Sequence, residues 1–183
     1  ISRRVVRAAY DTAYRFSKET SLFPIVMDFL NVTDKYYLME AISNYYLTRK
    51  VDYTTLTIAC FDEAAKNDEV AIDIFRETAE QLARSAGGVA VNLDFSDEVE
   101  IVLAGSVWVK ASCKVMQEAF SQYIQAFTGK KCNIQVLEVP PATGAVIWAQ
   151  ELFEGAFPTV EMRRKIIREV EFVLDKIQSH SAK

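Results

Sequence analysis

Glycine and histidine are scarce in this chain, and both shortages limit its chemistry. Only six of its 183 residues are glycine, and none belongs to a GxGxxG or GxxxxGK[ST] loop of the kind that cradles phosphate. The nearest approach, Gly129-Lys130-Lys131, has Ile124 in place of the first loop glycine and Lys131 in place of Ser or Thr. The one histidine, His180, lies in a polar tail, where a Ser–His or Cys–His pair inside a pocket is not expected. We therefore predict no catalytic residue in this chain.

Cysteine is also rare, and its spacing excludes the usual metal and redox motifs. The three cysteines, Cys60, Cys113 and Cys132, stand far apart and form no CxxC pair. An odd number of isolated cysteines is typical of a reduced intracellular chain. We expect buried or half-buried thiols, no metal site and a cytoplasmic location.

The chain lacks an excess of positive charge and any long apolar run. Its net charge is −4 and its isoelectric point about 5.2, which argues against a dedicated nucleic-acid-binding protein. No apolar stretch approaches the roughly 18–20 residues of a membrane helix, and the first residues lack a signal-peptide core. Half of the residues are hydrophobic and a quarter charged, as in one globular domain or one lobe of a larger protein.

Residues 1–97 are expected to be mainly helical. In residues 2–17, apolar side chains recur at the three- and four-residue spacing of an amphipathic helix. These residues are Val5, Val6, Ala9, Tyr10, Ala13 and Phe16. Three further helical stretches are predicted, at 21–46, 53–66 and 68–94. Asp52 and Asp68 are the predicted N-caps of the last two, and the last ends near Gly87-Gly88 or continues past them to Leu93.

Two side-chain clusters in this helical part allow two interpretations each. Tyr36, Tyr37, Tyr45 and Tyr46 resemble an aromatic platform for a nucleotide, but helix packing is the preferred interpretation. Several carboxylates resemble an acid–base cluster, although solvated helix faces and caps explain them better. They are Asp62, Glu63, Asp68, Glu69 and Asp73.

The pattern changes after residue 97. An apolar run rich in β-branched residues, Glu98–Ala104, predicts a buried strand, and Cys132–Val139 predicts a second one. Helices are expected between and after them, at Val107–Phe127 and Ala142–Phe153. This order predicts a βαβα unit on a parallel sheet, and hence a helix-rich α/β fold. Because a parallel sheet of two strands hardly ever forms alone, we infer that further strands belong to it.

The end of the chain, residues 155–183, is expected to form a separate amphipathic helix and a tail. Apolar residues between 158 and 179 make one stripe along that helix. The stripe can pack on residues 1–154 or mediate a homodimer.

The segment Val102–Trp108 is the most informative for function. A buried strand ends in Ala104-Gly105-Ser106 and turns directly into a helix, and small residues there let a flat ligand approach the backbone. Ser106 can cap the new helix, whose free N–H groups suit ribose hydroxyls or phosphate. Ligands of open α/β sheets gather at the carboxyl ends of strands, where this turn lies. The alternative is a tight turn that binds nothing.

A second candidate element follows the second strand. In Glu138–Ala145 two prolines stiffen the strand exit, and four small residues begin a helix that can pack close to a neighbour. Structural packing is the preferred interpretation, and a moving lobe interface is the alternative.

Taken in order, these segments resemble the C-terminal portion of the BadF/BadG-type ATPase family, which includes N-acetylglucosamine kinases. The similarity runs from residue 1 to about Glu154. It rests on the opening Ile-Ser-Arg-Arg helix, on Ala64–Ala71, on Val102–Val107 and on Val139–Ala145. Relatives usually have Gly-Asp where this chain has Asn67-Asp68, which is a mild departure.

The resemblance implies a partial lobe with the ribonuclease H-like fold of sugar kinases, Hsp70 and actin, together with an added helical region. It implies that Ala104, Gly105, Ser106 and Val107 form the adenosine motif. The family's phosphate motifs and catalytic aspartate precede the part that Ile1 begins, so ATP and Mg²⁺ would be held mainly by residues that this chain lacks. The implied partner is the N-terminal lobe of the same polypeptide.

The implied function is the C-terminal part of an ATP-dependent sugar kinase, acting on N-acetylglucosamine or a related sugar and inactive alone. A second hypothesis is an ATP-driven activator of a CoA-ester dehydratase or reductase, whose iron–sulfur cluster would need cysteine ligands upstream. A third is a non-catalytic nucleotide-sensing module. A DxGxT-like turn upstream would favour the first two, and a DNA-binding helix pair the third.

Overall fold

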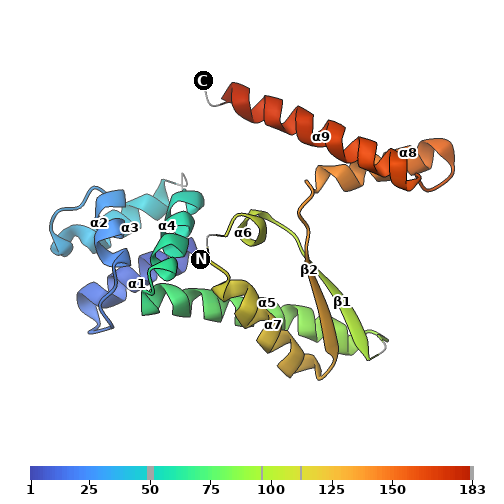
Figure 1. Ribbon diagram of the computed structural model, residues 1–183. Helices are drawn as coiled ribbons and strands as arrows, with labels where there is room; N and C mark the ends of the chain where they lie inside the picture. Colours follow the sequence, from blue (N-terminus) through green and yellow to red (C-terminus); the bar gives the residue numbers. More distant parts are fainter. Residues whose placement is uncertain (49–51, 96, 112, 182–183) are drawn as a thin grey trace. The chain divides into compact units, whose positions relative to one another are not determined.

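The protein is helix-rich and contains one small parallel sheet of two strands, β1 and β2 (Figure 1). The structure, a computed structural model, describes residues 1–48, 52–95, 97–111 and 113–181. It confirms the expectation of a helix-rich α/β chain, whereas the actin-like lobe stays a prediction. The chain divides into two compact units: Ile1–Glu100 with Lys110–Asn133, and Ile101–Val109 with Ile134–Lys183.

The first unit is a group of helices around an aliphatic core. Its elements are α1 (Ser2–Tyr14), α2 (Leu22–Phe29), the 3₁₀-helix η1 (Lys35–Tyr37), α3 (Leu38–Leu47), α4 (Tyr53–Ala65), α5 (Glu69–Asn92) and α7 (Val115–Thr128). Helix α1 contacts α2, α3, α4 and α5. Val5 and Ala9 of α1, Leu22 of α2 and Leu56 of α4 are fully buried. The rings of Phe61 and Phe75 stack at 4.1 Å and join α4 to α5.

Both predicted N-caps are confirmed. The Asp52 carboxylate accepts hydrogen bonds from the amides of Thr54 and Thr55, at 2.8 and 3.1 Å, and begins α4. Asp68 accepts from the Ala71 amide at 2.9 Å and begins α5. Helix α5 continues past the two glycines to Asn92, which is the second of the two predicted ends. Asp52 and Asp68 thus satisfy backbone donors that a helix start leaves unpaired.

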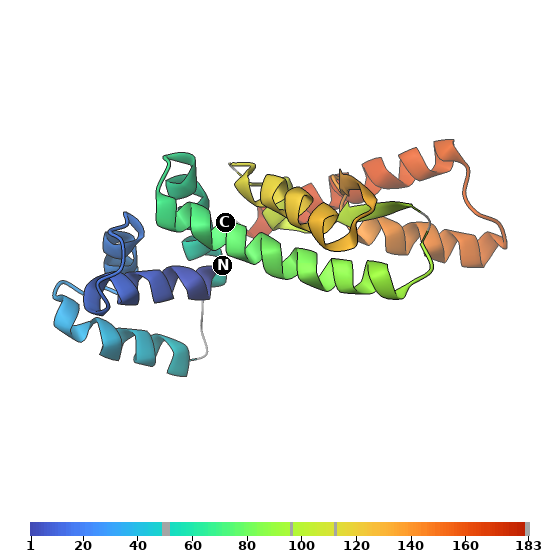
Figure 2. The same cartoon turned by 90° about the horizontal axis from the view of Figure 1, so that it is seen from below.

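Helix α7 packs along the second half of α5 (Figure 2). A Cβ at Gly87 would meet Phe127 Cβ at 3.4 Å, whereas one at Gly88 would meet no atom within 4 Å. The Arg84 guanidinium lies 4.8 Å from the centre of the Phe127 ring. Gly87 therefore serves the close approach of the two helices, and Gly88 does not.

The apolar stripe predicted for residues 2–17 is wrong at its end. Helix α1 stops at Tyr14, and Phe16 lies beyond it with a fully exposed side chain and a φ of +53°.

The prediction that the four clustered tyrosines pack between helices is confirmed only in part. Tyr45 packs edge-on against Phe29 at 5.4 Å, but Tyr36 is largely exposed. A periodic pattern predicts which face of a helix is apolar. It does not predict how far along that face the neighbouring helices pack against it.

The two predicted strands are present and parallel. Strand β1 (Glu98–Leu103) pairs with β2 (Lys131–Val136). The Lys131 amide donates to the Asp97 carbonyl at 3.0 Å, and the Leu137 amide donates to the Leu103 carbonyl at 2.9 Å. The same offset at both ends fixes a parallel register.

The single helix expected at Val107–Phe127 is wrong. The structure has a one-turn helix, α6 (Ser106–Val109), and a second helix, α7, that begins at Val115. The residues between the two helices, 110–114, are Lys, Ala, Ser, Cys and Lys, and Ala and Lys are good helix formers. Helix propensity therefore does not explain the end of α6, and the amphipathic pattern did not mark it.

The second unit contains α6, α8 (Ala142–Glu154) and α9 (Val160–Ser181). Helices α8 and α9 pack against each other, and Ile166 of α9 is buried. Large apolar side chains of both helices remain exposed, among them Trp148, Leu152 and Phe172. No helix within the described ranges is both long and apolar enough to cross a membrane.

Candidate functional site

The carboxyl ends of β1 and β2 form one edge, and both strands leave it through small residues. Because the strands are parallel and joined by the bond from Leu137 to Leu103, their exits start side by side. The first exit is Ala104-Gly105-Ser106, and the second leads through Pro140-Pro141 to Ala142. Both exits belong to the second unit. This is the edge at which ligands of open α/β sheets bind.

The first exit is open to solvent. Ala104, Gly105 and Ser106 are exposed, and Val107 is half-buried. Gly105 has a φ of +121°, and no atom lies within 4 Å of the position that a Cβ would take. Glycine is therefore needed here for the backbone conformation and leaves free space above the turn. A flat ring can approach this backbone closely.

Helix α6 adds little to anion binding at this turn. It has four residues and is separated from α7, so its dipole is small and its few free N–H groups are not backed by a long helix. The expectation that a long helix begins at this turn is therefore wrong, whereas the binding of ribose hydroxyls or phosphate at it stays a prediction. The Ser106 hydroxyl remains available for a neutral partner such as a ribose hydroxyl.

The second exit contains an unpaired buried hydroxyl. Thr143 is 1 % exposed, and among the residues that the structure describes its Oγ1 has no hydrogen-bond partner, although its amide donates to the Pro140 carbonyl at 2.9 Å. Its neighbours Ala142, Gly144 and Ala145 are exposed. Sequence reasoning assigned this segment to packing and did not single out Thr143. The sequence feature that could have indicated this buried hydroxyl is a threonine among the small residues Ala142, Gly144 and Ala145.

The edge has no positive charge in its own sequence and one negative charge. Neither 101–109 nor 137–149 contains a basic residue, and their one acidic residue is Glu138, which is exposed at the second exit. Such a surface suits an uncharged, flat group and a hydroxyl-bearing ring. These two segments offer no cationic side chain to neutralise a polyphosphate, and a single carboxylate is too few to hold a divalent cation.

The carboxylates singled out from the sequence do not form an acid–base site. Glu63 is buried, and its bond to Lys66 at 2.7 Å lowers the pKa of its carboxyl group. The Asp68 carboxylate accepts hydrogen bonds from backbone amides at the starts of α2 and α5.

Within the described ranges no group of three or more His, Cys, Asp or Glu side chains could hold a metal ion. Burial raises the pKa of the Cys60 thiol to about 12, so it stays protonated.

The bend between α4 and α5 explains an unusual asparagine. Asn67 has a φ of +70°, and the Asp68 amide donates to the Glu63 carbonyl at 3.0 Å while the Asn67 amide donates to the Ala64 carbonyl at 3.0 Å. This is the Schellman arrangement, in which the residue after the helix is left-handed and is usually Gly or Asn. The backbone therefore accepts either residue at position 67.

Comparison with known proteins found no matching family model, no matching curated protein and no matching solved structure. The BadF/BadG resemblance, and the role that it implies for Ala104, Gly105, Ser106 and Val107, therefore stay predictions.

Proposed function

We propose that this chain is the C-terminal part of an ATP-dependent sugar kinase of the N-acetylglucosamine kinase type, and that it supplies the adenosine side of the nucleotide cleft. The observation that carries the proposal is the shared exit of β1 and β2, where exposed small residues leave the backbone of Ala104 and Gly105 open. An adenine ring lies against this backbone. The Ser106 hydroxyl, and that of Thr143 after a small shift, hydrogen-bond the ribose.

Two further observations support a chain that forms part of a larger fold. A two-stranded parallel sheet is marginal by itself, so β1 and β2 need more strands beside them. Exposed side chains such as Trp148 (64 %) and Leu152 (70 %) on α8 indicate surfaces that another part of the protein covers. The left-handed Asn67 is also compatible with the Gly-Asp of the resembled family.

The proposed division of roles follows from the lack of positive charge in the two exits. Residues of the N-terminal lobe would hold Mg²⁺ and the phosphates, and the metal would supply the charge that neutralises them. An aspartate of that lobe takes the proton from the attacking sugar hydroxyl. The residues of this chain at the two strand exits hold the nucleoside and exclude water from one side of it.

We place the whole protein in the cytoplasm, where the three cysteines remain reduced.

A coupled assay with ATP, Mg²⁺ and N-acetylglucosamine tests the proposal. A longer polypeptide that includes the N-terminal lobe should phosphorylate the sugar, and the 183-residue chain alone should not. Turnover by the chain alone at about 1 s⁻¹, the lower end for kinases, would contradict the division of roles. ATP hydrolysis by the longer polypeptide that no sugar accelerates would favour an activator of another enzyme over a sugar kinase.

A further inference from the structure

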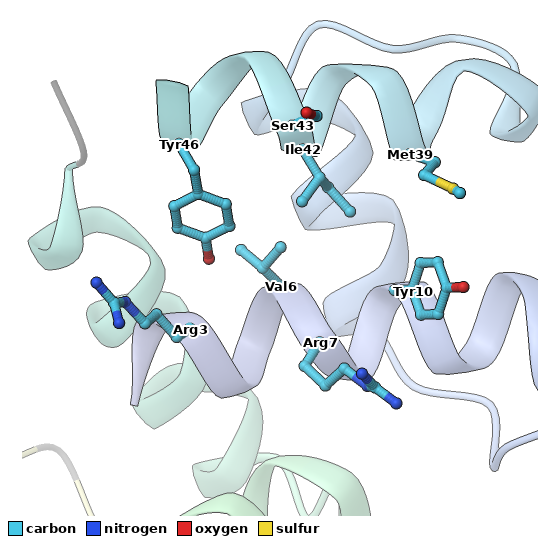
Figure 3. A pocket seen from close by; sticks show the side chains of 8 residues that line it. All are labelled: Arg3, Val6, Arg7, Tyr10, Met39, Ile42, Ser43 and Tyr46. Carbon is cyan, nitrogen blue, oxygen red and sulfur yellow. The ribbon is translucent and has the colours of Figure 1, made fainter. Parts of the chain in front are cut away.

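A groove between α1 and α3 in the first unit lies outside the proposed nucleotide edge. It has a volume of about 350 Å³, and its floor and sides include Val6 and Tyr10 of α1 and Met39, Ile42 and Tyr46 of α3 (Figure 3). Met39 is 56 % exposed, so its side chain is only partly covered by the protein. The volume is at the lower end of the range of small-molecule sites.

The groove has polar groups along its length, and Arg3 and Tyr46 lie together at one end of it. Figure 3 shows the Tyr46 ring directed toward α1 between Arg3 and Val6, whereas Tyr10 and Met39 lie at the opposite end. Burial raises the pKa of the Tyr46 phenol, against the opposing effect of the Arg3 charge. The hydroxyl is therefore protonated at neutral pH and can donate a hydrogen bond.

Arg3 supplies a positive charge that no carboxylate of the described residues neutralises. Within the described ranges its guanidinium donates to the Tyr53 hydroxyl at 3.4 Å and lies 6.0 Å from the centre of that ring, but it forms no ion pair. The other arginine of the groove, Arg7, is already held by both oxygens of Asp11 at 2.9 Å. No acidic residue lines the groove. A guanidinium without an ion pair beside the Tyr46 phenol is complementary to a single anionic group.

We propose that this groove binds a small carboxylate with an apolar or aromatic body. The carboxylate pairs with Arg3 and accepts from the Tyr46 hydroxyl, and the body lies on Val6 and Ile42 toward Met39. A polyphosphate is disfavoured because only one guanidinium is free, and a divalent cation because no carboxylate lines the groove. The site belongs to the first unit, so it does not depend on the proposed nucleotide edge.

Titration of the ¹⁵N-labelled 183-residue chain with 4-phenylbutyrate, followed by NMR, tests the site. We expect the amide signals of Val6, Ile42 and Tyr46 to shift, with a Kd of about 1 mM or tighter for a probe of this size. The neutral analogue 4-phenylbutyramide should bind about ten-fold more weakly, because it cannot form the charged hydrogen bonds to Arg3.

Variants distinguish the contribution of the Arg3 charge to binding from that of the apolar surface of the groove. Arg3→Gln should weaken binding of the acid about ten-fold without changing that of the amide. Met39→Glu places a negative charge on an exposed position of the groove and should also weaken binding of the acid. Arg76→Gln is the matched control, because Arg76 lies on α5, is exposed and pairs with Asp73 at 3.2 Å. Equal binding of acid and amide, equal loss in Arg3→Gln and Arg76→Gln, or shifts confined to other residues would overturn the proposal.

Discussion

The Ser21 hydroxyl donates a hydrogen bond to Asp68 Oδ2 at 2.7 Å, which joins the start of α2 to the start of α5. The Ser21 amide donates to the same oxygen at 2.8 Å, and the Thr20 hydroxyl reaches both carboxylate oxygens at 3.0 and 2.9 Å. The other oxygen, Oδ1, accepts from the Ala71 amide and caps α5. One carboxylate thus satisfies donors of two segments that lie 47 residues apart.

Asp68→Ala should lower the free energy of unfolding by about 2–3 kcal/mol, because it removes a helix cap and several charged hydrogen bonds together. Asp52→Ala is the control, since within the described part of the chain the Asp52 side chain accepts only from the neighbouring Thr54 and Thr55. We expect it to cost about 1 kcal/mol. Urea unfolding of both variants measures the difference. Equal costs would show that the bonds to Thr20 and Ser21 add nothing.

The stability that Asp68 supplies should depend on pH. Burial raises its pKa, but the hydrogen bonds from Ala71, Ser21 and Thr20 together outweigh this and lower it. A group with a lowered folded pKa stabilises the protein above its unfolded pKa, about 3.9, and loses this effect as the pH falls through the folded value. The stability difference between wild type and Asp68→Asn should therefore be constant from pH 7 to about 5 and shrink below about pH 4. A difference that grows on acidification would contradict the hydrogen-bond account.

Position 67 should favour glycine. With a φ of +70°, Asn67→Gly should be neutral or stabilise by a few tenths of a kcal/mol, and Asn67→Ala should cost about 1 kcal/mol because its Cβ crowds a left-handed backbone. Lys66 has a φ of −90°, so Lys66→Gly should gain nothing. Thermal unfolding of the three variants gives the order of their stabilities. Stabilisation by alanine at position 67 would rule out the left-handed conformation.

The two adjacent glycines of α5 should respond differently to a large side chain. Gly88→Leu should be neutral or stabilising, because leucine is the better helix former and no atom lies near its Cβ. Gly87→Leu should cost about 1–3 kcal/mol, since its side chain must enter the contact with Phe127 and Ile124. Chemical unfolding of the two variants measures the free energy of unfolding of each. Equal effects would mean that α7 does not lie against Gly87.

Local patterns predicted the elements well where one residue carried a clear signal. Asp52 and Asp68 marked helix starts, and the β-branched run before Ala104 marked β1. The prediction failed at Phe16 and between α6 and α7. At Phe16 the amphipathic pattern continued without the packing that a helix needs, and between α6 and α7 the pattern did not mark the end of the first helix. The site was harder to predict. Composition indicated an open turn at Gly105, but the buried Thr143 hydroxyl and the groove beside Arg3 depend on contacts between distant segments, which periodicity does not encode.

The most direct test of the central proposal is a comparison of Michaelis constants in the longer polypeptide. Gly105→Val is unsuitable, because a φ of +121° strains any substituted residue. Ala104→Leu fills the same exposed turn from its neighbour, and Ala65→Leu makes the same change at an exposed position of α4. If adenosine lies on this edge, Ala104→Leu raises the Michaelis constant for ATP about ten-fold or more and leaves that for the sugar within about two-fold, while Ala65→Leu changes neither. A folded Ala104→Leu protein with an unchanged Michaelis constant for ATP would contradict the placement of the nucleotide on this edge.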